Sequence, residues 1–192
     1  MSIWHWVRHG PTHQKSFVGW RDVDVDLSDT DQIARLDRFL PSDALVVSSD
    51  LKRSVKTADA ICNARQRLPH MPGLREFHFG DWDGLHFSEV AAQDPQTSRA
   101  FWESPGDITP PGGESWNTSA ARVAVAVQEL THAHPGREII AVAHMGVILT
   151  QIQAALKVAP QDVLRHKIDN FSVTTIDWTR TQDRVRRINH LP

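Results

Sequence analysis

The chain has 192 residues, 40% hydrophobic and 23% charged, which favours one compact domain, residues 1–192, with a sizeable core. Its formal net charge of -2 at pH 7 excludes the broad basic surface that nucleic acids and anionic membranes attract, so we expect neither as a partner. Cys62, the only cysteine, excludes an internal disulfide framework, and without a secretory signal or an apolar run of transmembrane length the sequence predicts a cytoplasmic protein.

Apolar strands and amphipathic helices alternate through the first third of the chain. The pattern predicts a strand at 3–7, a helix at 29–40, a strand at 44–48 and a helix from 51 to about 67. Ser49 and Asp50 are the expected capping residues of that second helix. Strand, helix, strand, helix is typical of a parallel sheet.

Prolines and glycines interrupt the pattern in the middle of the chain. We interpret residues 77–113 as an insertion that covers the substrate at the carboxyl edge of the sheet, with short helices at 88–93 and 96–103. The remaining periodicity predicts a helix at 114–134, a central strand at 138–143, a helix at 147–156, a helical segment from 160, and two antiparallel edge strands at 171–178 and 184–190.

Four residues whose side chains can take part in catalysis fall where parallel strands end. Arg8 and His9 follow the first strand, Arg53 begins the helix after the second, and His144 follows the central strand. The carboxyl edge of such a sheet is where ligands bind. Arginine offers a planar fork of donors for phosphate, and histidine serves as nucleophile or proton carrier near neutral pH. These positions indicate phosphoryl chemistry.

Five motifs in order resemble those of the histidine phosphatase superfamily, which includes phosphoglycerate mutase and the α-ribazole phosphatases. They are Arg8-His9-Gly10, Ser48–Ala58, Leu74-Arg75-Glu76 with Phe79–Gly84, Gly112–Ser115 and Val142–Gly146. The resemblance implies a phosphoglycerate mutase-like fold: a three-layer α/β/α sandwich around a mostly parallel sheet with an antiparallel edge. It also implies a phosphatase that needs no metal and no cofactor. A small phosphomonoester is the expected partner, and a homodimer is compatible with it.

The same resemblance implies roles for individual residues. His9 is the expected nucleophile that takes up the phosphoryl group, and Glu76 is the acid that protonates the departing oxygen. Arg8, Arg53 and His144 form the expected cationic pocket, to which Thr12 adds as a phosphate-binding residue. The residues expected to contact the rest of the substrate are Lys15, Gly19, Trp82 and Trp102, with Trp20 and Trp116 as further candidates.

Each of these residues has a structural alternative. Arg53 could lie on a solvated helix surface, and His144 could be a core histidine with its hydrogen bonds satisfied. Glu76 could lie on an exposed loop, in which case Asp81 or Asp83 could be the acid. The remaining histidines favour structural or surface roles, and none is spaced like a pair of metal ligands on a helix.

The sequence departs from the family pattern in ways that bear on substrate. Met145 stands where a second glycine commonly follows the later histidine, and Gln14-Lys15 where many members carry an asparagine. Phe17–Asp22 resembles the mutase branch, but the insertion is shorter than a mutase's and has six acidic residues against one basic, Arg99. A mutase must hold a carboxylate and a second phosphate. We therefore expect a monoesterase whose substrate has a neutral, aromatic or basic end. The alternatives are mutase-type phosphotransfer and an inactive phospho-ligand or partner-binding module.

Overall fold

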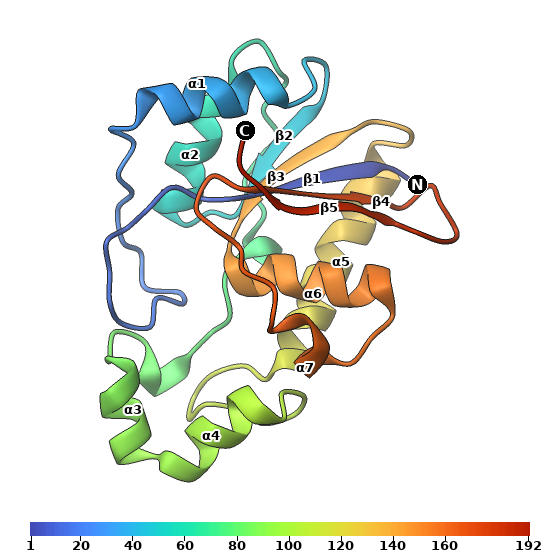
Figure 1. Ribbon diagram of the computed structural model, residues 1–192. Helices are drawn as coiled ribbons and strands as arrows, with labels where there is room; N and C mark the ends of the chain where they lie inside the picture. The colour runs from blue at the N-terminus through green and yellow to red at the C-terminus, as the bar shows by residue number, and fades with distance from the viewer.

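One five-stranded sheet, ordered β2-β3-β1-β4-β5, forms the centre of the molecule (Figure 1). A computed structural model describes all residues, 1–192. The strands are β1 Ile3–Arg8, β2 Leu45–Ser48, β3 Ile139–Ala143, β4 Val173–Asp177 and β5 Val185–His190. β2, β3 and β1 pair in parallel, whereas β4 runs antiparallel to both β1 and β5. The predicted parallel sheet with an antiparallel edge is confirmed.

Helices lie on both faces of this sheet. The helices are α1 Thr30–Phe39, α2 Lys52–Cys62, α3 Phe87–Gln93, α4 Pro95–Glu103, α5 Trp116–Ala133, α6 Met145–Leu156 and α7 Pro160–Val163, with short 3-10 helices at Pro72–Leu74 and Gly80–Trp82. In Figure 1, α1 and α2 lie on one side of the sheet, and α5 and α6 lie on the other. No helix combines the length and the hydropathy that crossing a membrane requires.

The side chains of β3 show why both faces are covered. All five residues of this strand are buried. Ile139, Ala141 and Ala143 pack into the larger core on the side of α5 and α6, whereas Ile140 and Val142 pack into the smaller core beneath α1 and α2. Successive side chains of a strand point to opposite faces, so a continuous apolar run predicts a strand buried on both sides.

The second helix is shorter than the sequence predicts. α2 ends at Cys62 rather than near Arg67, because Asn63 turns with a φ of 47° and Arg67 then pairs with Val46 beside β2. The predicted caps are also wrong, since Leu51 occupies the N-cap position and no side chain caps the helix. Ser49 instead lies against the ring of His144, and Asp50 accepts from the guanidinium of Arg75.

Candidate active site

Two parallel strands bring the histidines together. β1 ends at Arg8 and its neighbour β3 ends at Ala143, with Arg8 paired to Ala143 in the register. The backbone N–H of His9 donates to the carbonyl of Ala143 at 3.1 Å. The rings of His9 and His144 therefore lie 5.1 Å apart, centroid to centroid. The expected meeting of these residues at the carboxyl edge is observed.

The ring of His9 is oriented for chemistry at one nitrogen. Nδ1 lies 2.7 Å from the carbonyl oxygen of Gly10, an acceptor, so Nδ1 bears the proton and Nε2 keeps its lone pair. The side-chain amide of Asn170 donates to the backbone carbonyl of His9 at 2.7 Å and fixes this turn. Burial, reinforced by the charges of Arg53 and Arg8, holds the pKa of His9 well below its ordinary value. The ring is therefore neutral at pH 7.

His144 is fully buried beneath this ring. Its Nδ1 accepts from Nε of Arg53 at 3.3 Å, which leaves the proton on Nε2, where the hydroxyls of Ser49 and Ser54 lie at 2.8 and 3.2 Å. Burial and the charge of Arg53 keep the pKa of His144 well below its ordinary value. The structure thus places His144 behind Arg53, as its support, rather than on the cavity wall.

Two arginines lie close enough to His9 for their charges to lower its pKa. The terminal nitrogens of Arg53 donate to the carbonyls of Arg21 and Gly19 at 3.0 and 2.7 Å, which orients its guanidinium. Arg8 donates once, from Nη1 to the carbonyl of Ile168 at 2.6 Å, and its buried Nε has no acceptor within the protein. A buried donor without a protein partner is uncommon and points to a ligand acceptor such as a phosphate oxygen.

Glu76 lies on a loop, yet its carboxyl group is buried. Oε1 accepts from the N–H of Phe77 at 3.0 Å, and Oε2 accepts from the N–H of Gly146 in the first turn of α6 at 3.2 Å. A Cβ at position 146 would lie 2.5 Å from Oε1, so only glycine allows this approach. Burial raises the pKa of Glu76 above its ordinary value, against the opposing hydrogen bonds and arginine charges. Such a carboxyl group can carry a proton.

A cavity of about 230 Å³ joins these groups. The predicted residues that line it are Arg8, His9, Thr12, Lys15, Arg53, Glu76 and Trp102. An apolar wall is formed by Trp102 together with Phe17, Phe79, Phe87 and Met145. Phe87 comes from α3 and Trp102 from α4. The pocket therefore has a cationic floor with a buried carboxyl group and an aromatic rim.

Two of the expected substrate contacts do not reach the cavity. Trp82 is buried against the rings of Phe17 and Phe101, with centroids 5.9 and 5.6 Å away, so its place in the core overturns the expectation. Gly19 lies behind Arg53, and its backbone carbonyl accepts a hydrogen bond from the Arg53 guanidinium. A Cβ at position 19 would lie 2.5 Å from the carbonyl oxygen of Phe77. Trp116 likewise faces the core, with its indole N–H donating to Gln153.

Sequence reasoning missed the residues that hold the site from behind. The sequence pattern predicts a helix cap at Ser49 and indicates no role for Asn170. An asparagine just before the predicted strand 171–178 could have been noticed, because the chain there must pass the end of β1. Ser49 gives no such signal, since a serine after a strand is as typical of a cap.

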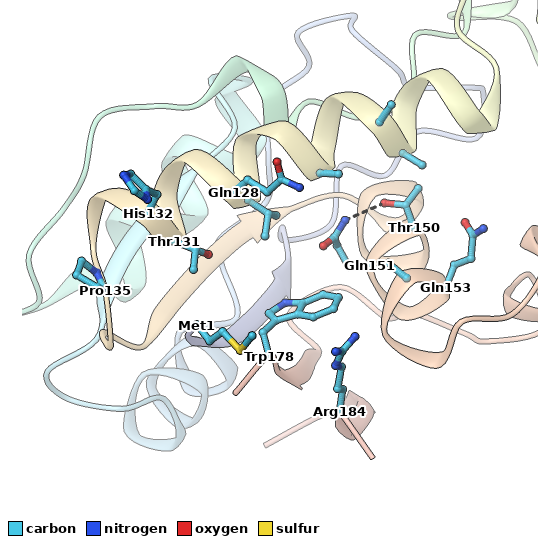
Figure 2. A pocket seen from close by; sticks show the side chains of 15 residues that line it. Met1, Gln128, Thr131, His132, Pro135, Thr150, Gln151, Gln153, Trp178 and Arg184 are labelled. Carbon is cyan, nitrogen blue, oxygen red and sulfur yellow. Dashed lines mark hydrogen bonds between the residues drawn. The ribbon is translucent and has the colours of Figure 1, made fainter. Parts of the chain in front are cut away.

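A second, larger cavity lies between α5, α6 and the β4–β5 hairpin (Figure 2). It encloses about 900 Å³, contains none of the predicted site residues, and is lined by Trp178, Arg184 and several glutamines and alanines. Met1 and Pro135 at its wall precede β1 and β3, so it lies at the amino edge of the sheet. Arg184 is its only arginine, lysine or carboxylate residue. The chemistry of the lining favours the smaller cavity as the active site.

The chain is similar to known proteins over nearly its whole length. Residues 5–191 match the family model of the histidine phosphatase superfamily, branch 1. The chain is 33% identical over 185 residues to phosphoglycerate mutase-like protein 4 of Arabidopsis thaliana, covering 90% of this chain and 80% of that protein. A mycobacterial glucosyl-3-phosphoglycerate phosphatase in complex with inorganic phosphate is 27% identical with a TM-score of 0.83, covering 99% of this chain and 98% of that one. An α-ribazole phosphatase from Shigella flexneri, 24% identical, shares the fold with a TM-score of 0.83 over 98% of this chain and 96% of its own.

Proposed function

The chain belongs to the histidine phosphatase superfamily, branch 1, and from that premise we propose that it is a metal-independent phosphomonoesterase that works through a phosphohistidine on His9. The observation that carries the proposal is that His9, Arg8, Arg53 and Glu76 line one cavity, with Nε2 of His9 unprotonated. An inactive phosphate-binding module would need the arginines but neither a neutral histidine nor a buried carboxyl group whose pKa is raised.

The first step transfers the phosphoryl group to the enzyme. The lone pair on Nε2 of His9 forms a P–N bond while the ester P–O bond breaks, and the electron pair leaves on the ester oxygen. That oxygen takes the proton of Glu76, whose raised pKa keeps the proton available. Arg8 and Arg53 balance the negative charge that spreads over the equatorial oxygens. The products of this step are an alcohol and phosphohistidine.

The second step returns the enzyme to its starting state. Glu76, now a carboxylate, takes a proton from water, and the water oxygen forms a P–O bond as the P–N bond breaks. The electron pair of that bond returns to Nε2 of His9, and inorganic phosphate leaves. Covalent capture thus divides one difficult hydrolysis into two easier transfers.

The cavity wall favours an apolar or aromatic group on the substrate. Residues 77–113 contribute Phe79, Phe87 and Trp102 to the wall and no charged side chain. Arg99, the only basic residue of that segment, pairs with Glu103 at 2.8 Å on an exposed helix face. A bisphosphorylated acid would need further cations there. We infer a small phosphomonoester whose other end is neutral, aromatic or basic.

Hydrolysis in the presence of a chelator tests the proposal. Wild-type protein treated with EDTA should release phosphate from phenyl phosphate at an undiminished rate, and alkaline quenching during turnover should trap one phosphoryl group on His9, seen by peptide mass spectrometry. Phosphate passed to a second acceptor in place of water would instead identify mutase-type transfer. Absence of hydrolysis with any monophosphate, together with phosphate binding, would identify a binding module.

A further inference from the structure

Glu76 has no regular secondary structure to hold it, although acid catalysis requires a fixed carboxyl group. It lies after the 3-10 helix Pro72–Leu74, on a loop between the sheet and α5. Its own backbone carbonyl accepts from the indole N–H of Trp20 at 2.8 Å and from Nη2 of Arg122 at 3.3 Å. The support for this loop therefore comes from two side chains that lie outside the cavity lining.

Arg122, in the first half of α5, uses every donor it has. Nη1 donates to the carbonyls of Gly73 and Arg75, both at 3.0 Å, and Nη2 donates to Glu76. Nε and Nη2 also donate to the two oxygens of Glu114 at 2.9 and 2.7 Å. A guanidinium has five N–H groups, and here all five have acceptors. One side chain thus fixes the carbonyls of three residues in the loop.

Glu114 extends the support to the other side of Glu76. Its Oε2 accepts from the backbone N–H of His78 at 3.1 Å, and its own N–H donates to the carbonyl of His78 at 2.8 Å. The Arg122–Glu114 pair is largely buried, which favours a rigid, bidentate geometry. The loop is therefore held both before and after the residue that carries the proton.

Trp20 connects this support to the phosphate-binding side. The guanidinium carbons of Arg75 and Arg122 lie 4.9 and 5.9 Å from the centre of its ring, so two cations pack against the indole. The backbone carbonyls of the residues on either side of it, Gly19 and Arg21, accept hydrogen bonds from the guanidinium of Arg53. A single turn of chain thus sets the position of Arg53 relative to Glu76.

From this geometry we propose that Arg122, held by Glu114, is a positioning residue that aligns the carboxyl group of Glu76 with the leaving oxygen, and that the indole N–H of Trp20 shares this role. The proposal rests on the phosphomonoesterase function. It predicts a specific defect: loss of alignment impairs proton donation and leaves phosphate binding largely intact.

Leaving groups of different basicity reveal that defect. An alkyl phosphate expels an alkoxide and needs the proton, whereas 2,4-dinitrophenyl phosphate expels a stable anion and does not. The measurement is kcat/KM, which reports only steps up to formation of the phosphohistidine. Arg122→Lys should lower kcat/KM roughly 10–50-fold for ethyl phosphate, a part of the 10²–10⁴ that a positioned acid contributes. For the dinitrophenyl ester it should change kcat/KM by about 2-fold.

Arg65→Lys is the matched control. Arg65 is also buried, pairs with Asp37 and donates to the carbonyls of Pro41, Ile61 and Leu40, but it does so far from Glu76. Its variant should keep the wild-type ratio between the two substrates. Trp20→Phe keeps an aromatic ring but removes the indole N–H together with the five-membered ring that bears it. It is the second test if Arg122→Lys fails to fold, with an expected loss of about 5-fold confined to ethyl phosphate.

The outcomes separate the two levels of the proposal. Equal losses on both substrates in the variant that folds, or no loss on either, would overturn the positioning role while leaving the phosphatase intact. Failure of wild-type protein and Arg65→Lys to hydrolyse either ester would instead refute the proposed function. Thermal unfolding of each variant identifies which ones are folded.

Discussion

The two edges of the sheet carry cavities of opposite character. The cavity at the carboxyl edge is small, about 230 Å³, and contains two arginines, a lysine, a histidine and a buried carboxyl group. The one at the amino edge is larger, about 900 Å³, and Arg184 is its only arginine, lysine or carboxylate residue (Figure 2). Parallel strands turn into loops and helix starts at their carboxyl ends, where backbone N–H groups and polar side chains converge. Converging chemistry, and not the size of the cavity, therefore locates the site.

Loss of the nucleophile at the carboxyl edge should lower the phosphatase rate far more than loss of the arginine at the amino edge. His9→Asn removes the nitrogen that forms the covalent bond, so phosphate release from phenyl phosphate should fall at least ~10³-fold. Arg184→Gln removes the cation of the amino-edge cavity and should leave the rate within about 2-fold of wild type. A phosphatase assay at saturating substrate measures both. Comparable losses in the two variants would contradict the assignment of the chemistry to the carboxyl edge.

Loss of the acid should be smaller and should change the pH profile. Glu76→Gln should lower kcat/KM for an alkyl phosphate by about 10²-fold. In the wild type the reactive form needs a protonated Glu76, whose pKa is raised by burial, and a neutral His9, whose pKa is lowered by burial. Activity should therefore decline as pH rises through the pKa of Glu76, and this decline should disappear in the variant.

Asp81→Asn is the control for that experiment. Asp81 is exposed and does not line the cavity, although it lies near Glu76 in the sequence. Its variant should keep both the rate and the alkaline decline of the wild type. If the decline persisted in Glu76→Gln and vanished in Asp81→Asn, the acid would have to be reassigned.

Stability should also respond to pH through the buried histidines. Burial keeps the pKa of His144 well below its ordinary value in the folded chain, whereas an unfolded histidine takes up a proton near pH 6.5. The stabilising contribution is present above the unfolded pKa and is lost as pH falls, by about 1.4 kcal/mol per pH unit for each such histidine. Urea unfolding of His144→Asn between pH 6.5 and 5.5 should show a shallower loss than wild type.

His132→Asn provides the comparison at the amino edge. This histidine lines the larger cavity and its side chain is exposed. Because this histidine is not one of the buried groups, its variant should retain the pH dependence of the wild type. Glu76 is present in every protein of this set, and its own titration cancels in the comparison. An equal change of slope in both variants would show that burial is not the cause.

The elements and the residues at strand ends were predictable because they depend on local pattern. An apolar run followed by Arg8 and His9 predicts where those side chains emerge, and β1 and β3 place them as expected. Glu76 could be assigned only by its resemblance to a family, since it lies on a loop without periodicity. Its burial depends on a backbone contact with Gly146, 70 residues away, which no local signal reports.

The supports of the site were not predictable for the same reason. Arg122 lies on a helix, where an arginine is typical of a solvated face, and only the folded chain brings it against three carbonyls. For Trp82 the sequence predicts a functional role, and the structure shows a core position instead. An aromatic residue in residues 77–113 is compatible with substrate contact, but Trp82 packs in the core against Phe17 and Phe101.

The rim of the carboxyl-edge cavity should give the smallest effect, because its contacts are apolar and partly hydrated. Phe87 is 52% exposed, and its ring lies 4.4 Å from that of Phe17 at the cavity wall. Losing one aromatic contact costs about 1 kcal/mol, so Phe87→Ala should raise KM for phenyl phosphate roughly 5-fold. Ethyl phosphate cannot reach an aromatic contact of this kind, so its KM should not change. Val125→Ala, on α5 and 54% exposed, removes a similarly exposed apolar side chain that lines neither cavity and should change neither value. An equal rise in KM for both esters with Phe87→Ala would mean that the rim shapes access to the phosphate pocket rather than binding the organic group.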